Sequence, residues 1–331
     1  MDSAPQIAGG ATVGKLLKTV WPGIATDAAR LVAWAVQNET ARACLNAFYE
    51  RLSARNKAAF YARFAKLFRH REARLASGRW RVRFRGHRIE LPLHPETMWL
   101  DWDSALSALG HEPEIKATYA TLIDALPALD CVFDVGANYG LHSLLFLANG
   151  IPVVSFEPNP ACREYVERLE ALNDVRFSVE PIALDASNGH AELCFPHADV
   201  WLGTIDPEHV PNLAARFALE RIEVACETLD SYVDRTGRAP GLIKIDTEGT
   251  ELRVLSGARR TLERARPIVI FECWRGHDRS ALWRCLNTLG YVITALPLTS
   301  LGAVAALDES EFSRNGGTNF AALPGERYAR A

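Results

Sequence analysis

The chain has 331 residues, of which 48% are hydrophobic and 23% are charged, with a formal net charge of −3. These values are typical of an ordinary soluble globular protein, and no apolar run approaches the roughly 20 residues that cross a bilayer. The seven cysteines are scattered without a CxxC pair, which argues against disulfides and a cysteine metal site. No signal-peptide pattern opens the chain, so we expect a cytoplasmic protein.

Residues 1–15 are small and polar and are predicted to form a disordered tail. Residues 16–78 have the apolar spacing of helices. Between Arg51 and Arg88 the chain has thirteen Lys or Arg residues against one acid, Glu72. This basic segment suggests contact with a polyanion, an anionic membrane surface or an acidic partner. It could equally be solvated or dock on the acidic remainder of the chain.

Residues 79–128 are predicted as a β-hairpin followed by a helical lead-in. Apolar and basic residues alternate from Trp80 to Arg85, which is the period of a strand. Gly86 and His87 form a turn signal, after which the alternation resumes. Residues 99–128 then have the pattern of a helix.

Strands and helices alternate over residues 129–326, which predicts a mostly parallel sheet with helices on both faces. Strands are expected over residues 131–136, 152–157, 176–183, 242–246, 267–272, 291–296 and 319–323. Residues 191–195 and 220–227 are predicted as antiparallel additions. Ligands of such sheets bind outside the carboxyl ends of the strands.

The strand that ends near Gly136 is followed by a loop of small residues that lets backbone approach a ligand. The next strand ends in Glu157, 21 residues after Gly136, where an acid can accept both hydroxyls of a ribose. Asn138 stands where a dinucleotide site would favour glycine against a pyrophosphate. The pattern therefore favours S-adenosylmethionine (SAM) over a nicotinamide cofactor or a purely structural turn.

Three blocks of sequence, residues 133–143, 156–160 and 242–251, resemble the FkbM family of SAM-dependent methyltransferases. The third block contains the most specific match, Lys244-Ile245-Asp246-Thr247-Glu248-Gly249, and the likeness extends over about Glu112 to Pro324. It implies an α/β, class I methyltransferase (Rossmann-like) fold with a seven-stranded, mostly parallel sheet whose last strand is antiparallel. It also implies methyl transfer to a hydroxyl of a sugar, glycolipid or secondary metabolite.

The expected cofactor-binding residues lie at the ends of the first three strands. They are Asp134, Gly136, Ala137, Asn138, Gly140, Glu157, Pro158 and Asp185. Asp134 would hold the amino group of the cofactor or order the loop. Glu157 would bind the ribose, and Asp185 would meet the adenine.

The expected catalytic residues are Asp246, Glu248, Glu272 and His142. An alcohol acceptor must lose its proton, and Asp246 is the leading general base because its strand ends beside the methyl group in this fold. Glu248 would line the acceptor pocket or stabilise a helix start. His142 would reach the cofactor or acceptor, or pack its helix, and His277 is a further base candidate.

Lys244 within a buried strand needs a paired acid, for which Asp134 or Glu272 is available. Asp246 and Glu272 could together hold Mg²⁺. A metal-free site is the main expectation because the sequence shows no third ligand. Glu251 is assigned to the start of a helix rather than to chemistry.

Two other functions fit parts of the sequence. An RNA methyltransferase would use the basic residues 51–88 on phosphates, and its binding would depend steeply on salt. A non-catalytic module would bind SAM or a partner without turnover. The acceptor of the main hypothesis is a small molecule, glycan or lipid-linked compound, and the basic segment would allow a place at the membrane periphery.

Overall fold

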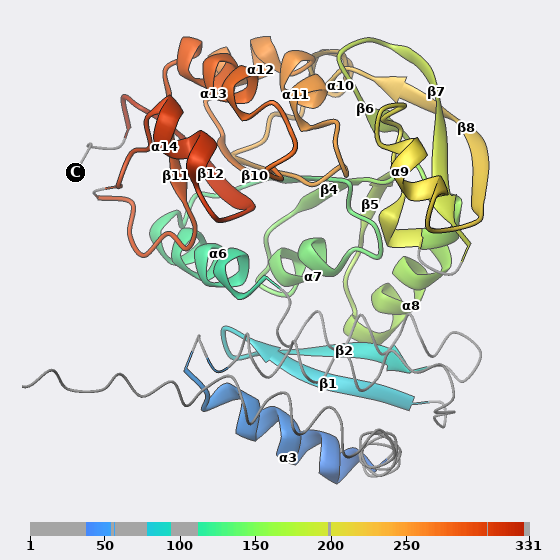
Figure 1. Ribbon diagram of the computed structural model, residues 1–331. Coiled ribbons are helices and arrows are strands. Elements are labelled where there is room, and N and C mark those ends of the chain that lie inside the picture. Colours follow the sequence, from blue (N-terminus) through green and yellow to red (C-terminus); the bar gives the residue numbers. More distant parts are fainter. Residues whose placement is uncertain are drawn as a thin grey trace, which may run out of the picture. The chain divides into compact units, whose positions relative to one another are not determined.

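The computed structural model describes residues 38–53, 56, 78–93, 112–197, 200–302 and 304–327 (Figure 1). The chain divides into two compact units, residues 1–82 with 91–111 and residues 83–90 with 112–331. The predicted tail, most of the basic segment and the first part of the predicted 99–128 helix lie outside the described residues. Among the helices described, none is long and apolar enough to cross a membrane.

The first unit contains helix α3 (Glu39–Glu50), which begins at Asn38. The Asn38 side chain accepts a hydrogen bond of 2.8 Å from the backbone N–H of Thr40, a favourable N-cap. The helix is tied to strand β1 (Gly78–Phe84) because the buried Trp80 donates its indole N–H to Asn46 Oδ1 at 2.9 Å. A helix in this part of the chain is therefore confirmed.

Strand β1 pairs with β2 (His87–Leu93), which confirms the predicted hairpin. The turn lies one residue earlier than predicted, at Arg85 and Gly86. Both residues have left-handed φ values, 52° and 84°. A two-residue turn with positive φ at both positions matches the twist of paired strands, so this geometry fixes the register.

The second unit is built on a seven-stranded sheet of order β11-β12-β10-β9-β3-β4-β5. Its strands are β3 (Val132–Val135), β4 (Val153–Phe156), β5 (Ser178–Glu180), β9 (Leu242–Ile245), β10 (Ile268–Glu272), β11 (Tyr291–Ala295) and β12 (Asn319–Pro324). Neighbours from β5 to β10 pair in parallel, whereas β12 is antiparallel to both β10 and β11. The predicted class I arrangement is confirmed.

Helices cover both faces of this sheet. They are α6 (Pro113–Ala125), α7 (Leu141–Leu147), α8 (Arg163–Asn173), α10 (Leu229–Thr236), α11 (Glu251–Ser256), α12 (Arg259–Ala265), α13 (Arg279–Thr288) and α14 (Glu309–Arg314). Figure 1 shows α6, α7 and α8 on one face and α10 to α13 on the other. This double covering explains why the central strands are buried along their whole length.

The two faces of the central strands differ in chemistry. Phe133 of β3 and Ile243 of β9 belong to the main apolar core, together with Leu262 of α12. The next residue of each strand points to the opposite face, where Asp134 lies directly beside Lys244 in the parallel register. A charged pair is thus built into the centre of the sheet, directly below its carboxyl edge.

Two elements differ from their predictions. The pattern of residues 250–264 predicts one helix, but the structure has two, α11 and α12, which meet at Gly257. A Cβ at Gly257 would lie 2.1 Å from the carbonyl oxygen of Asp185. The third predicted strand splits into β5 and β6 (Ala183–Leu184). Strand β6 joins a separate sheet of order β6-β8-β7, in which β7 (Gly189–Pro196) and β8 (Leu219–Glu227) are the predicted antiparallel pair.

Candidate functional site

The loop between β3 and α7 is pressed against the end of β9. Gly136 has a φ of 74°, and a Cβ there would lie 1.8 Å from the carbonyl oxygen of Asp246. Gly140 also has a φ of 74°, and a Cβ there would lie 2.6 Å from the ring of Phe177. Glycine is required at both positions because no side chain fits and the left-handed conformation is strained for other residues.

Most backbone N–H groups of this loop are already bonded within the protein. Gly136 and Ala137 both donate to the carbonyl oxygen of Phe156, at 3.0 and 3.1 Å, and Gly140 donates to Ala137 at 2.8 Å. The N–H of Asn138 donates to Glu157 Oε2 at 2.7 Å. The loop therefore offers a close backbone surface rather than a cradle of free donors for a phosphate.

Glu157 follows β4 and faces the loop. Its second oxygen, Oε1, accepts from the backbone N–H of Asn159 at 2.7 Å, across the intervening Pro158. Burial raises the pKa of Glu157 to about 7, although the backbone donors of Asn159 and Asn138 oppose that rise. The side-chain nitrogen of Asn159 is buried with no hydrogen-bond partner in the described chain. The end of β4 thus combines a carboxyl acceptor with an unused amide donor, and a ligand's hydroxyls can bind to both kinds of group.

Asp134 lies beneath the loop, with 1% of its surface exposed. Its Oδ2 accepts from Ser143 Oγ of α7 at 2.6 Å, and Oδ1 lies 3.5 Å from Lys244 Nζ. Ser143 is also within 2.8 Å of Ser155 Oγ on β4. Asp134 therefore joins β3, α7 and β9, an arrangement that orders the loop from below.

Lys244 is the positive charge of the site and is 3% exposed. It lies 3.2 Å from Asp246 Oδ2 as well as 3.5 Å from Asp134 Oδ1. Burial alone would lower the pKa of Lys244, but the two carboxylates outweigh burial and raise it. The sequence offered Asp134 or Glu272 as the acid paired with Lys244. The structure pairs Lys244 with Asp134 and, in addition, with Asp246.

Three acids gather at the ends of β9 and β10. One carboxylate oxygen each of Asp246, Glu248 and Glu272 lies within 4.8 Å of the others, so this acid cluster could hold a metal ion. Burial, together with the charges of Asp246 and Glu251, raises the pKa of Glu248 to about 8. Burial and the charges of Asp246 and Glu248 raise the pKa of Glu272 to about 10. The third acid, Glu248, was not considered as a metal ligand from sequence.

Glu251 shapes the loop that carries Glu248. Its Oε1 accepts from the backbone N–H groups of Thr247 and Gly249, at 3.0 and 3.2 Å, and from Thr247 Oγ1 at 2.9 Å. His277 Nδ1 lies 3.7 Å from its other oxygen. Glu251 therefore holds the loop in place at the start of α11. It also lies close to one ring nitrogen of His277.

His142 has partners at both ring nitrogens. Nδ1 lies 2.9 Å from the hydroxyl of Tyr119, and Nε2 lies 3.4 Å from Glu112 Oε2. Glu112 is fixed in turn by Asn319, which donates to Glu112 Oε1 at 3.1 Å and sits opposite Glu272 across β12 and β10. Glu112 escaped the sequence reasoning because it precedes the alternating region and carries no motif.

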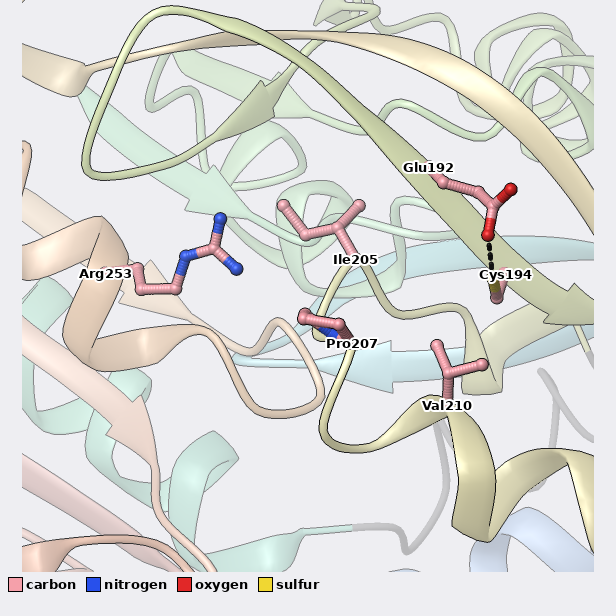
Figure 2. A pocket seen from close by; sticks show the side chains of 6 residues that line it. All are labelled: Glu192, Cys194, Ile205, Pro207, Val210 and Arg253. Atoms are coloured by element: carbon pink, nitrogen blue, oxygen red, sulfur yellow. Dashed lines mark hydrogen bonds between the residues drawn. The ribbon is translucent and has the colours of Figure 1, made fainter.

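Asp185, expected near an adenine, is held by Arg253 of α11. Arg253 Nε donates to Asp185 Oδ1 at 2.7 Å, and Nη2 donates to Oδ2. The same guanidinium lines a cavity of about 260 Å³, which Figure 2 shows between β7 and α11. The lining residues are Glu192, Cys194, Ile205, Pro207, Val210 and Arg253.

The cavity shares a wall with the loop that carries Glu248. Thr204 Oγ1 donates to the carbonyl oxygen of Glu248 at 3.0 Å. Two residues later, Asp206 lies so close to Gly249 that a Cβ there would be 2.9 Å from its carboxylate. The segment after β7 therefore supports the acid cluster from outside the main sheet, a contact that the sequence did not predict.

Residues 134–293 match the family model described as Methyltransferase FkbM domain. A methyltransferase from Sordaria araneosa, sdnD, is 28% identical over 211 residues, which are 55% of this chain and 81% of that protein.

Solved structures show more distant likeness. Methyltransferase FkbM from Methylobacillus flagellatus is 18% identical with a TM-score of 0.37, over 80% of this chain and 60% of that one. A SAM-dependent methyltransferase from Agrobacterium tumefaciens is 11% identical with a TM-score of 0.39, over 76% of this chain and 71% of that one.

Proposed function

This chain contains an FkbM methyltransferase domain at residues 134–293, and from that premise we propose that it is a SAM-dependent O-methyltransferase. The acceptor is a hydroxyl of a sugar, glycolipid or secondary metabolite. One observation carries the proposal: the loop after β3, which offers few free donors for a phosphate, lies beside the acid cluster. The two are in contact where Gly136 meets the carbonyl oxygen of Asp246. One side suits a ribose-bearing cofactor without phosphates, and the other suits removal of a hydroxyl proton.

The residues at the ends of β3 and β4 fit SAM. Glu157 would accept hydrogen bonds from the ribose hydroxyls, and the unpartnered side-chain N–H of Asn159 would donate to one of their oxygens. Gly136, Ala137 and Gly140 would form the close backbone surface, and Asn138 would lie beside the ribose. Asp134 would order the loop through Ser143. Asp185, whose carboxylate is tied to Arg253, would lie at the edge of the adenine pocket.

When bound, SAM supplies a sulfonium methyl group for an in-line displacement. The chain must hold the acceptor oxygen in line, which is worth up to roughly 7–11 kcal/mol for well-oriented reactants. Asp246 would accept the hydroxyl proton, since the raised pKa values of Glu248 and Glu272 leave both protonated at neutral pH. Those two carboxyl groups would line the acceptor pocket, and Lys244 would hold Asp246 in place.

His142 would position the acceptor side of the site rather than take the proton, because both its ring nitrogens are engaged. A metal is not part of the proposal, although the acid cluster could hold Mg²⁺. A cytoplasmic location and an anionic surface contact through residues 51–88 remain predictions, as do the domain limits at residues 16, 79 and 129.

Two substitutions test the two halves of the proposal. Glu157→Ala should weaken SAM binding at least 100-fold in calorimetry, because the ribose loses its carboxyl acceptor. Asp246→Asn should bind SAM within threefold of the parent protein but lose at least 100-fold in methyl transfer, followed with methyl-labelled SAM and cell extract as the source of acceptor.

Glu167→Ala, an exposed position on α8, is the matched control and should change neither measurement. Unchanged SAM affinity in Glu157→Ala would reject the cofactor site. Full transfer activity in Asp246→Asn would reject Asp246 as the base while leaving the cofactor site intact. Saturable SAM binding by the parent protein with no labelled product from any extract would favour a non-catalytic module.

A further inference from the structure

Trp274 is a large apolar side chain held open to solvent. It follows β10 directly, and 48% of its surface is exposed. Only four large hydrophobic residues of the described chain are exposed to a comparable degree, and Trp274 is the one at a carboxyl strand end beside the acid cluster. An indole left uncovered there calls for an explanation other than packing.

The backbone around Trp274 is fixed on both sides. The N–H of Cys273 donates to Thr318 at 2.7 Å, and the carbonyl of Cys273 accepts from Arg279 Nη2 at 2.6 Å. The carbonyl of Trp274 accepts from the N–H of His277 at 3.1 Å. The exposed ring therefore stands on a rigid turn, which lowers the entropy lost when a ligand covers it.

The ring is also oriented by its own polar atom. Its indole N–H donates to Glu272 Oε2 at 2.7 Å. Glu272 belongs to the acid cluster, whose oxygens lie within 4.8 Å of one another. One hydrogen bond thus places an apolar aromatic ring directly beside a group of carboxyl oxygens.

We propose that Trp274 is the stacking platform for a sugar ring of the acceptor, with Glu248 and Glu272 binding the hydroxyls at that ring's rim. This inference rests on the proposed methyl transfer and narrows its acceptor to a carbohydrate. A pyranose presents C–H groups on its faces and hydroxyls around its edge. The C–H faces match the face of an indole, and the hydroxyls match carboxyl oxygens that accept hydrogen bonds.

The rim chemistry separates a sugar from other acceptors that would cover an indole. An alkyl chain would cover the ring but leave buried carboxyl groups without partners, which is costly. The carboxyl oxygens of Glu248 and Glu272 suit a polyol, because several hydroxyls on one ring can donate hydrogen bonds to them.

The test uses the full chain saturated with S-adenosylhomocysteine and a panel of methyl pyranosides of gluco, galacto, manno and 6-deoxy configuration. Saturation-transfer NMR measures binding, with catechol and 1-octanol as competing probe classes. At least one pyranoside should bind, with the strongest transfer to C–H protons of one face. Trp274→Ala should weaken that pyranoside at least tenfold, whereas Trp274→Phe, which keeps an aromatic face, should stay within threefold.

Trp201→Ala removes another exposed indole, in a short 3-10 turn, and should leave pyranoside binding unchanged. Thermal melting of each variant confirms folding. The platform is overturned if no pyranoside binds, if Trp274→Ala binds as the parent protein does, or if only catechol or octanol binds. Affinity for S-adenosylhomocysteine is measured in parallel: its absence in the parent protein rejects the proposed function, whereas its presence without pyranoside binding rejects the platform alone.

Discussion

The two sides of the candidate site, the loop from Gly136 to Gly140 and the acid cluster, differ in how well their polar groups are satisfied within the protein. In the loop from Gly136 to Gly140, backbone donors find partners within the protein and no room is left for a Cβ at either end. In the acid cluster, Glu248 and Glu272 are crowded together under conditions that raise the pKa of both. The first side is preformed, whereas the second is costly to maintain without a ligand.

This difference fits the two tasks of a transferase. A cofactor that is the same in every turnover favours a rigid surface, which lowers the entropy lost on binding. Crowded acids gain when an acceptor supplies hydrogen bonds to them, so their unfavourable state is relieved by the correct ligand. Lys244 stands between the two sides, since it contacts both Asp134 under the loop and Asp246 in the acid cluster.

The largest effect is expected where the loop meets β9. Gly136→Ala places a Cβ 1.8 Å from a backbone oxygen and should lower the free energy of unfolding by roughly 4 kcal/mol or more. Gly150→Ala is the matched control, because Gly150 has a similar φ of 76° but no atom within 4 Å of the added Cβ. It should cost only about 1–2 kcal/mol of backbone strain. Equal losses in urea unfolding would show that the loop is not tightly packed.

The next effect concerns the shared charge. Lys244→Met leaves Asp134 and Asp246 without their cation and should lower the free energy of unfolding by about 3–5 kcal/mol at pH 7. Adding Asp134→Asn should restore part of the loss, because only one buried carboxylate then remains unpaired. Urea unfolding of the single and double variants measures both values. If Lys244→Met had the same free energy of unfolding as the parent protein, the proposed link between the two sides would be rejected.

A smaller effect, of opposite sign, is expected in the acid cluster. The pKa of Glu272 is raised from its ordinary value to about 10. The contribution of Glu272 to the free energy of unfolding is therefore fully present below about pH 4.5 and is lost as the pH rises towards 10. Glu272→Gln, a neutral isostere, should therefore stabilise the protein by roughly 1–3 kcal/mol at pH 9 relative to its effect at pH 5.

Urea midpoints at pH 5, 7 and 9 measure this difference, with Glu167→Gln on the exposed face of α8 as the control. The glutamine keeps an oxygen for the indole N–H of Trp274, so that contact survives. If the urea midpoints of the parent protein and Glu272→Gln changed with pH in parallel, the acid cluster would not destabilise the folded protein as proposed.

The sequence predicted those parts of the fold that depend on local pattern. Apolar runs placed all seven strands, and the spacing from Gly136 to Glu157 located the two strand ends that meet through Asn138. The close contact of Gly257 with the carbonyl oxygen of Asp185 could not be predicted, because Asp185 is distant in sequence.

The positions of candidate site residues were predictable where a strand end marked them and hidden where a tertiary contact defines them, whereas their roles stay predictions. Asp246, Glu248 and Glu272 lie at or just beyond strand ends, and their carboxyl groups gather at that edge of the sheet. Glu112 acquires its relevance only through His142 and Asn319, which are far from it in the chain. The exposure of Trp274 is likewise invisible in sequence, where an aromatic residue after an apolar strand predicts burial.

The contact between Gly136 and the carbonyl oxygen of Asp246 has a consequence for how this protein can be altered. This contact is between backbone atoms of the loop and of the strand end that carries Asp246, and no acceptor-side side chain takes part in it. Side chains on the acceptor side, such as Trp274, can be exchanged without changing that spacing. Acceptor range and reaction geometry are therefore separable, and a library confined to the acceptor side should yield variants with new substrates that retain the parental affinity for the methyl donor.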